Sequence, residues 1–219
     1  MIRTEIVFVT LLGWTVFSEA GLLGGLSMPP DLAFLFNGNR NQMNATLYNY
    51  NASASEFVSL GTYPSGVFFP GMPRRISSSA YVLTGKGGEY VTTFFKNRDV
   101  YFSNGTNGAL VRSMFNISML FDNGPWRADA AYTVLNGERE VIGTNFILRH
   151  KLYECGALGT TCNSSTLHTV ATFSTSFLRD GRIRAALGLS DGKVALFKTK
   201  VYAIVHKKGD PAEERPMFT

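Results

Sequence analysis

Aromatic rings placed among polar and turn residues are the side chains of this sequence best suited to holding a ligand. Trp126 lies between Pro125 and Arg127 directly after a turn, and Tyr48 and Tyr50 alternate with asparagines. A ring with a polar edge can contact a lipid headgroup, a sugar or a quaternary cation. The alternative interpretation is that each ring only anchors its own loop. The pattern favours non-covalent binding and leaves both interpretations open.

Catalytic patterns are scarce in this chain. It has 3 His residues, and no Gly-X-Ser-X-Gly elbow, His-Glu-X-X-His pair or Walker phosphate loop. His150 and His168 could meet a Ser and an Asp in space, an arrangement that sequence order does not reveal. We therefore expect no catalytic residues, no cofactor and no enzyme activity, with a hydrolase as the remaining alternative.

The two cysteines lie close together, with Cys155 and Cys162 enclosing six residues. In an oxidising compartment this spacing favours one small-loop disulfide. A metal site would need at least three ligands at suitable spacing, and only His150 and His168 are near in sequence. We expect a disulfide and no metal.

Residues 1–20 resemble a secretory signal peptide. A basic start at Arg3 is followed by an apolar run from Ile6 to Phe17, and Ser18 and Ala20 form a small-residue cleavage site. The alternative is an N-terminal strand. The apolar run is too short for a membrane span of ~20 residues. The prediction is a secreted, extracellular protein that begins near residue 21.

Five Asn-X-Ser/Thr sequons fit this compartment, since they carry glycans only after export. They are Asn44, Asn51, Asn104, Asn116 and Asn163. The net charge of +5 permits attraction to anionic membranes or acidic glycans without requiring it. A secreted chain without a basic helix or zinc knuckle is not expected to bind nucleic acid.

Alternating apolar and polar residues predict strands throughout the chain. The stretches 111–121, 128–134 and 141–148 are interpreted as a meander, and Asn136-Gly137 suits the tight turn of a hairpin. A further strand is expected at 169–178. About ten strands and little helix predict an all-β antiparallel sandwich. It would form one domain over 21–206, with a polar tail at 207–219.

Short landmarks give the chain a resemblance to actinoporins, a family of secreted β-sandwich cytolysins whose fold is shared by fungal fruit-body lectins. They are Asn-Ala-Thr-Leu-Tyr-Asn-Tyr-Asn-Ala-Ser at 44–53, Pro-Gly at 70–71, the glycines of 85–88 and the stretch 107–123. The resemblance implies binding of lipid headgroups or glycans through loop residues, and the matching positions are Ser53, Phe121, Asn123 and Trp126. The family's long amphipathic N-terminal helix has no counterpart here, which puts pore formation in doubt.

The function expected from the sequence is therefore binding of membrane lipid or carbohydrate, with cytolysis as its extended form. The ligand contacts would come from Tyr48, Tyr50, Ser53, Phe121, Asn123 and Trp126. The alternative is a secreted or virion-surface structural glycoprotein that binds a protein partner. The sequence allows homo-oligomers.

Overall fold

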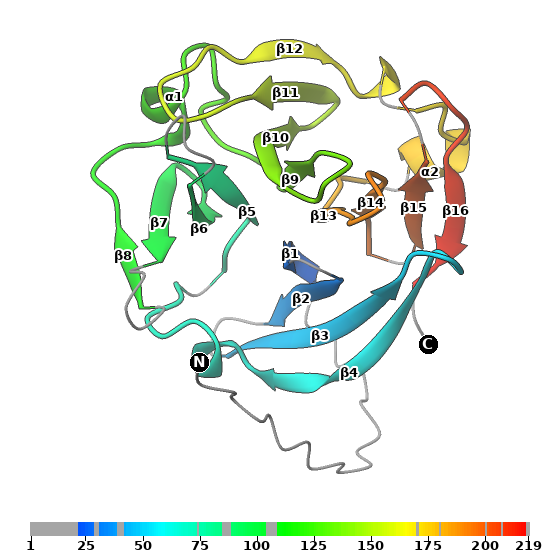
Figure 1. Ribbon diagram of the computed structural model, residues 1–219, viewed down its shortest axis with the longest axis horizontal. Coiled ribbons are helices and arrows are strands. Elements are labelled where there is room, and N and C mark those ends of the chain that lie inside the picture. Colours follow the sequence, from blue (N-terminus) through cyan, green and yellow to red (C-terminus); the bar gives the residue numbers. More distant parts are fainter. Residues whose placement is uncertain are drawn as a thin grey trace.

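A computed structural model describes residues 22–28, 31–38, 42–73, 75–84, 89–103, 109–169, 171–179, 181–199, 201–206 and 208–217. Within these ranges 16 strands form four sheets of four strands each. Figure 1 shows the sheets arranged as blades around a common axis, with β1, β5, β9 and β13 innermost. The chain is a four-bladed β-propeller. The expected signal peptide and Asn104 lie outside the described residues.

Each blade is built from four consecutive antiparallel strands. Blade 1 holds β1 (Leu22–Met28), β2 (Leu32–Gly38), β3 (Met43–Asn51) and β4 (Glu56–Pro64). Blade 2 holds β5 (Ser78–Leu83), β6 (Tyr90–Lys96), β7 (Asp99–Ser103) and β8 (Leu110–Arg112). Blade 3 holds β9 (Ala130–Leu135), β10 (Val141–Leu148), β11 (Lys151–Cys155) and β12 (Asn163–Thr166). Blade 4 holds β13 (Ala185–Gly188), β14 (Val194–Phe197), β15 (Val201–Val205) and β16 (Glu213–Pro216).

Small residues and hydroxyl groups let the four inner strands approach each other at the axis. The Ser79 hydroxyl of β5 donates to the Gly25 carbonyl of β1 at 2.7 Å. Thr133 of β9 accepts a hydrogen bond from the Tyr81 amide of β5 at 2.9 Å. Gly188 of β13 lies so close to β9 that a Cβ there would be 1.8 Å from the Thr133 carbonyl oxygen. Backbone polar groups and tight packing therefore connect the blades at the centre.

Four hydrophobic clusters fill the four spaces between neighbouring blades. In β2, Phe34 and Phe36 pack in the cluster shared with blade 2, whereas Ala33 and Leu35 pack in the cluster shared with blade 4. Successive side chains of a strand point to opposite faces of its sheet. Both faces of a blade are consequently buried against neighbours.

This arrangement corrects the predicted ten-strand β-sandwich. The all-β class is confirmed, but the strands form four small sheets around an axis instead of two stacked sheets. Alternation of apolar and polar residues indicates that a strand has two different faces, but it does not indicate which element packs against each face. In β5 all six residues are buried, which a half-exposed sandwich strand would not show.

The first and last blades are joined by side chains and not by a shared strand. Phe197 of β14 packs edge-on against Phe57 of β4, with ring centroids 5.7 Å apart. The Tyr50 hydroxyl donates to Asp191 at 3.1 Å, and the Lys193 amine donates to the Ser55 hydroxyl at 2.9 Å. These contacts close the ring.

Two predicted strands are wrong because side-chain caps start helices there. In the stretch 111–121 the only strand is the end of β8, and α1 (Ile117–Leu120) follows. The Asn116 side chain accepts a hydrogen bond from the Met119 amide at 3.1 Å, a typical N-cap. In the stretch 169–178, Ser174 accepts from the Phe177 amide at 3.0 Å and α2 (Thr175–Arg179) begins.

Two further segments differ from their expected form. The turn at Asn136-Gly137 is a five-residue loop, in which the Asn136 side chain accepts from the amides of Glu138 and Glu140. Residues 213–216, expected within a polar tail, pair with β15 as the outermost strand of blade 4. The remaining helical turns are η1 (Ser65–Val67) and η2 (Leu167–Thr169). None of the described helices has the length and apolar character that crossing a membrane requires.

Candidate functional site

The two tyrosines expected at a binding rim are interior residues. Tyr48 and Tyr50 are each 3% exposed and pack in the cluster between blades 1 and 4. Burial raises the pKa of the Tyr48 hydroxyl to about 12. Burial also raises the pKa of Tyr50, and the neighbouring Asp191 carboxylate adds to the rise. Both tyrosine side chains help to hold blade 1 against blade 4, and neither faces solvent.

The other predicted contacts are spread over two blade regions. Ser53 is exposed in the β3–β4 turn, where its amide donates to the Asn51 side chain at 3.1 Å. Phe121 is 1% exposed and packs against Phe146 with ring centroids 5.5 Å apart. Asn123 is exposed, with a φ of 57° in the connection between α1 and β9. The structure therefore does not bring the six predicted residues into one site.

Trp126, in the connection between α1 and β9, is the predicted ring that remains available. Its side chain is 45% exposed. The guanidinium carbons of Arg98 and Arg127 lie 5.1 and 4.5 Å from the ring centroid, within cation–π range. We call these three residues the Trp126 platform. It presents a partly exposed apolar ring beside two sets of planar hydrogen-bond donors.

Arg127 also lines a hollow where the inner strands begin, which we call the axial hollow. It offers about 200 Å³ to water-sized groups. Its apolar lining includes Leu22, which lies at the start of β1. It also includes one residue shortly before each of the other inner strands: Ile76 before β5, Ala128 before β9 and Ile183 before β13. Its polar lining consists of Arg75, Ser77, Asn97, Arg127, Asp129, Arg182 and Arg184. The hollow is thus the mouth of the propeller axis.

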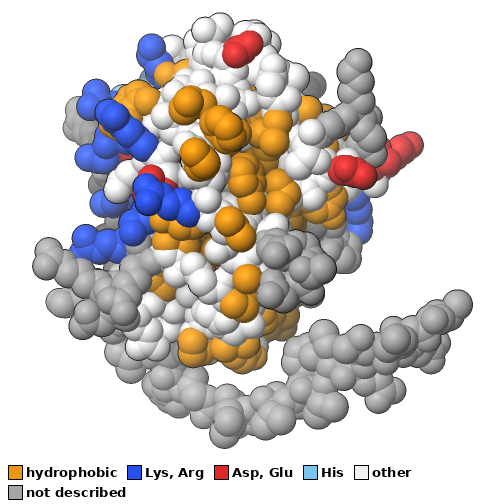
Figure 2. All heavy atoms as spheres, turned by 90° about the vertical axis from the view of Figure 1, so that its left-hand side faces the viewer, with side chains coloured by type: hydrophobic (Ala, Val, Ile, Leu, Met, Phe, Trp, Pro, Cys, Tyr) orange, Lys and Arg blue, Asp and Glu red, His pale blue; other side chains and the backbone are white. Residues whose placement is uncertain are grey.

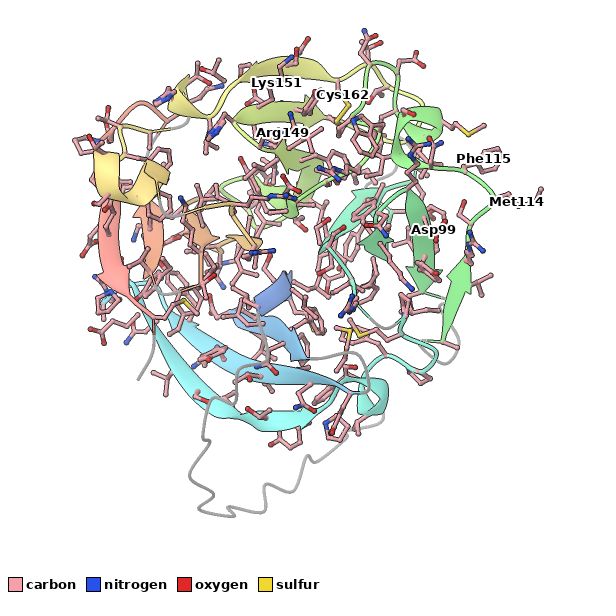
Figure 3. All side chains as sticks on the ribbon, turned by 180° about the vertical axis from the view of Figure 1, so that it is seen from behind. Asp99, Met114, Phe115, Arg149, Lys151 and Cys162 are labelled. Atoms are coloured by element: carbon pink, nitrogen blue, oxygen red, sulfur yellow. A yellow bond between two sulfur atoms is a disulfide. The ribbon has the colours of Figure 1, made fainter. Side chains whose placement is uncertain are left out.

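The axial hollow is strongly basic, because four arginines line it against one aspartate. Asp129 is already occupied: Arg182 lies 3.5 Å away, and the Arg149 amide donates to its other oxygen at 2.9 Å. Among the described residues, no carboxylate lies within ion-pair distance of Arg75, Arg127 or Arg184. In Figure 2, Lys and Arg side chains gather on the left, the side that Figure 3 views face on.

The opposite mouth of the axis has a different character. The hollow described there is small, with about 10 Å³ between Met28, Leu135 and Gly188 at the ends of three inner strands. Asp31 accepts a hydrogen bond from the Ser190 hydroxyl there, and Arg139 lies 3.8 Å from the Asp31 carboxylate. Of these two hollows, the larger and more basic one lies where the inner strands begin.

A second hollow lies at the outer edge of blade 2, next to Arg98. It offers about 460 Å³ and is lined by Arg98, Asp99, Arg112, Ser113, Met114, Phe115 and Asn116. Arg112 donates to Asp99 at 2.7 Å across this hollow. Figure 3 shows Met114 and Phe115 pointing outward from the rim, and Met114 is 96% exposed. We call this the rim hollow, and the Trp126 platform lies between it and the axial hollow.

The histidines expected in the hydrolase alternative lie on blade 3. His150 is exposed between β10 and β11, and His168 is exposed in η2. Neither imidazole has a hydrogen bond to a Ser hydroxyl or a carboxylate within the described chain. No cluster of three or more potential His, Cys, Asp or Glu ligands occurs in the same ranges.

The predicted disulfide is confirmed between Cys155 and Cys162. It closes the loop between β11 and β12, next to α1, where the Cys162 amide donates to the Asp122 carbonyl at 2.7 Å. The bond therefore fixes the segment that leads to Trp126.

The arginines of the axial hollow were not among the sequence-predicted ligand residues. Arg75 lies three positions before β5, Arg127 three before β9, and Arg184 one before β13. A basic residue shortly before a strand is unremarkable unless that strand is known to be innermost. The available signal is that each arginine lies shortly before an inner strand, and it becomes visible only once the blades are assigned.

The fold is shared with solved plant proteins. "Hemopexin fold protein CP4" from cow pea matches with a TM-score of 0.59 and 14% identity over 90% of this chain and 94% of that one. A Cicer arietinum albumin described as showing hemagglutination matches with a TM-score of 0.61 and 13% identity, over 89% and 90% of the two chains. A Cicer arietinum lectin with two metal binding sites matches with a TM-score of 0.60 and 13% identity, over 90% and 91%.

These matches overturn the resemblance to actinoporins, because the similar structures are propellers and not sandwiches. The short landmarks that suggested the resemblance are turn and sequon residues, which any protein with many hairpins contains. The cytolysin expectation depended on that resemblance and falls with it. No family model and no curated protein matches the sequence.

Proposed function

We propose that this protein is a lectin-like binding protein that takes a carbohydrate on the Trp126 platform. The carrying observation is a 45% exposed tryptophan held beside two arginines, between two hollows. The shared fold with a plant lectin and a hemagglutinating albumin supports a carbohydrate as the ligand. A binding role without catalysis fits this arrangement.

The platform has the two kinds of contact that a sugar needs. The exposed part of the indole can cover the apolar C–H surface of a sugar ring, and Trp is an effective anchor because it loses little conformational freedom on binding. Guanidinium groups are planar donors that can bridge two oxygens. Because Arg98 and Arg127 lie over the ring, the indole also holds those donors in place. A bound sugar would extend from the platform into one of the adjoining hollows.

The first test is Trp126→Ala in glycan-array and calorimetric titrations. We expect affinity for the best array ligand to fall by more than about tenfold, since truncation of an anchoring Trp commonly costs ~2 kcal/mol or more. Tyr63→Ala is the matched control, because Tyr63 is a 37% exposed ring on blade 1. Unchanged affinity in Trp126→Ala would exclude the platform as the site.

A protein partner is the second candidate, favoured by the exposed apolar residues in and around the rim hollow. Val111, Met114, Phe115 and Met119 are each more than half exposed. Absence of binding to any glycan, together with binding to anionic vesicles or to a specific protein, would replace the carbohydrate proposal.

We further propose that the protein is secreted and glycosylated. The disulfide supports an oxidising compartment. Asn51 and Asn163 are exposed, and the Asn51 carbonyl oxygen holds the β3–β4 turn while its amide nitrogen stays available. Asn44 and Asn116 are half-buried.

Expression in a secreting eukaryotic cell tests this proposal. We expect glycans at Asn51 and Asn163, detected as mass loss after enzymatic deglycosylation and as site-specific peptides. Asn51→Gln and Asn163→Gln should each remove one glycan. Retention of the chain inside the cell, without glycans at either site, would contradict secretion.

A further inference from the structure

We propose that the axial hollow is an oxyanion site and that the anion it takes is the acidic group, above all a sulfate, of a glycan. This inference deepens the function proposed above and rests on it for the source of the anion. The site itself is argued from the charges and geometry at the mouth of the axis.

The first argument for an oxyanion site is the uncompensated positive charge of the axial hollow. Arg75, Arg127 and Arg184 reach the hollow from three different blade connections, and none has a carboxylate partner in the described chain. Asp129, the only acidic group among the described residues that line the hollow, is held by Arg182 and by the Arg149 amide. Like charges that converge on a concave surface raise the potential there and attract anions.

The second argument is a hydrogen-bond donor without a partner beside the hollow. The Nε atom of Arg127 is shielded from solvent and has no hydrogen-bond partner among the described residues. A buried donor without a partner costs free energy, so this atom calls for a partner such as an ordered water or a bound anion. The Arg127 guanidinium also lies 4.5 Å from the centre of the Trp126 ring, which fixes its position at the edge of the hollow.

Size and donor geometry identify the ligand class. The hollow offers about 200 Å³, ample for a tetrahedral oxyanion with a few waters. Guanidinium forks bind two oxygens of sulfate, phosphate or carboxylate at once. Asn97 lines the hollow at the turn between β6 and β7 and adds an amide donor.

Continuity with the Trp126 platform argues for a glycan as the source of the anion. Arg127 belongs to both the platform and the axial hollow, so a sugar on the platform can place an acidic substituent into the hollow. A free inorganic anion would use the hollow alone. The two sources therefore predict different dependence on Trp126.

The test titrates the full chain with inorganic sulfate alone, then with a sulfated galactan oligosaccharide and with the same oligosaccharide after desulfation. Arg75→Gln and Arg184→Gln remove charge from the hollow and leave the platform intact. Arg139→Gln is the matched control, because Arg139 is an exposed arginine at the opposite mouth of the axis. Melting curves verify folding of each variant.

We expect the protein to bind inorganic sulfate at constant ionic strength. Arg184→Gln should lower the affinity for sulfate at least about tenfold. Arg139→Gln should stay within about twofold. The sulfated oligosaccharide should bind at least about tenfold more tightly than the desulfated one. The double variant Arg75→Gln/Arg184→Gln should remove that difference in affinity. In the same double variant, the desulfated oligosaccharide should still bind through Trp126.

Each of the other outcomes would contradict a specific part of the proposal: the oxyanion site, the glycan as source of the anion, or the carbohydrate function. No sulfate binding, or equal loss in Arg139→Gln, overturns the oxyanion site even if neutral glycans bind. Sulfate binding with no preference between the two oligosaccharides overturns the glycan as its source. Sulfate binding without binding of any glycan keeps the oxyanion site and rejects the carbohydrate function.

Discussion

Gly188→Ala is expected to lower the free energy of unfolding by about 3 kcal/mol or more, since forced overpacking against a rigid neighbour has costs of this order. A Cβ at this position would lie 1.8 Å from the Thr133 carbonyl oxygen. That contact is with backbone, and Thr133 also accepts the Tyr81 amide hydrogen bond, so β9 cannot move aside without disturbing β5. The propeller axis would have to widen.

Thermal and urea unfolding measure this effect. A loss of about 3 kcal/mol corresponds to roughly 6–12 °C in Tm for a chain of this size. Gly137→Ala is the control, because a Cβ added at Gly137 would meet no atom within 4 Å and the φ of Gly137 is not positive. It should leave stability unchanged or raise it by about 0.4–1 kcal/mol. Similar melting temperatures for both variants would contradict the tight axis.

Phe197→Ala is expected to remove about 3–5 kcal/mol, the usual cost of truncating a fully buried Phe. Phe197 is 0% exposed and lies between Phe57 of blade 1 and Tyr202 of blade 4, with ring centroids 5.7 and 5.4 Å away. Blades 1 and 4 share no strand and are not consecutive in the chain. No direct chain connection joins them, so the cavity should also open the ring of blades locally.

Amide hydrogen exchange distinguishes local opening from general loss of stability. Phe146→Ala is the matched control, because Phe146 is also 0% exposed but lies between consecutive blades 2 and 3. We expect β4 and β14 to exchange faster than the remaining strands only in Phe197→Ala. Uniform acceleration in both variants would show that closure between blades 1 and 4 is no weaker than the other interfaces.

Local signals in the sequence predicted three individual features correctly. The strands expected at 128–134 and 141–148 correspond to β9 and β10, and the short spacing of Cys155 and Cys162 indicated the correct disulfide. These features depend on residues near each other in the chain. The stretch 111–121 failed for the same kind of reason, because one capping side chain, Asn116, outweighed a plausible alternation.

The ligand site shows the limit of such signals. Tyr48 and Trp126 both stand among polar residues in the sequence, yet Tyr48 is 3% exposed and Trp126 is 45% exposed. What separates them is the neighbouring blade: blade 4 covers the Tyr48 ring, whereas two arginines leave part of the Trp126 ring open. Exposure is decided by segments that lie far away along the chain.

The sequence by itself determined the all-β class, the strands β9 and β10 and the Cys155–Cys162 pairing, because period-two alternation, turn residues and loop length act over a few residues. Only the tertiary structure decided between two stacked sheets and four blades, and only it brought Arg75, Arg127 and Arg184 to one mouth of the axis. The physical reason is that a strand's alternation is satisfied by any apolar neighbour on each face, so the identity of that neighbour is fixed by the packing of the whole ring.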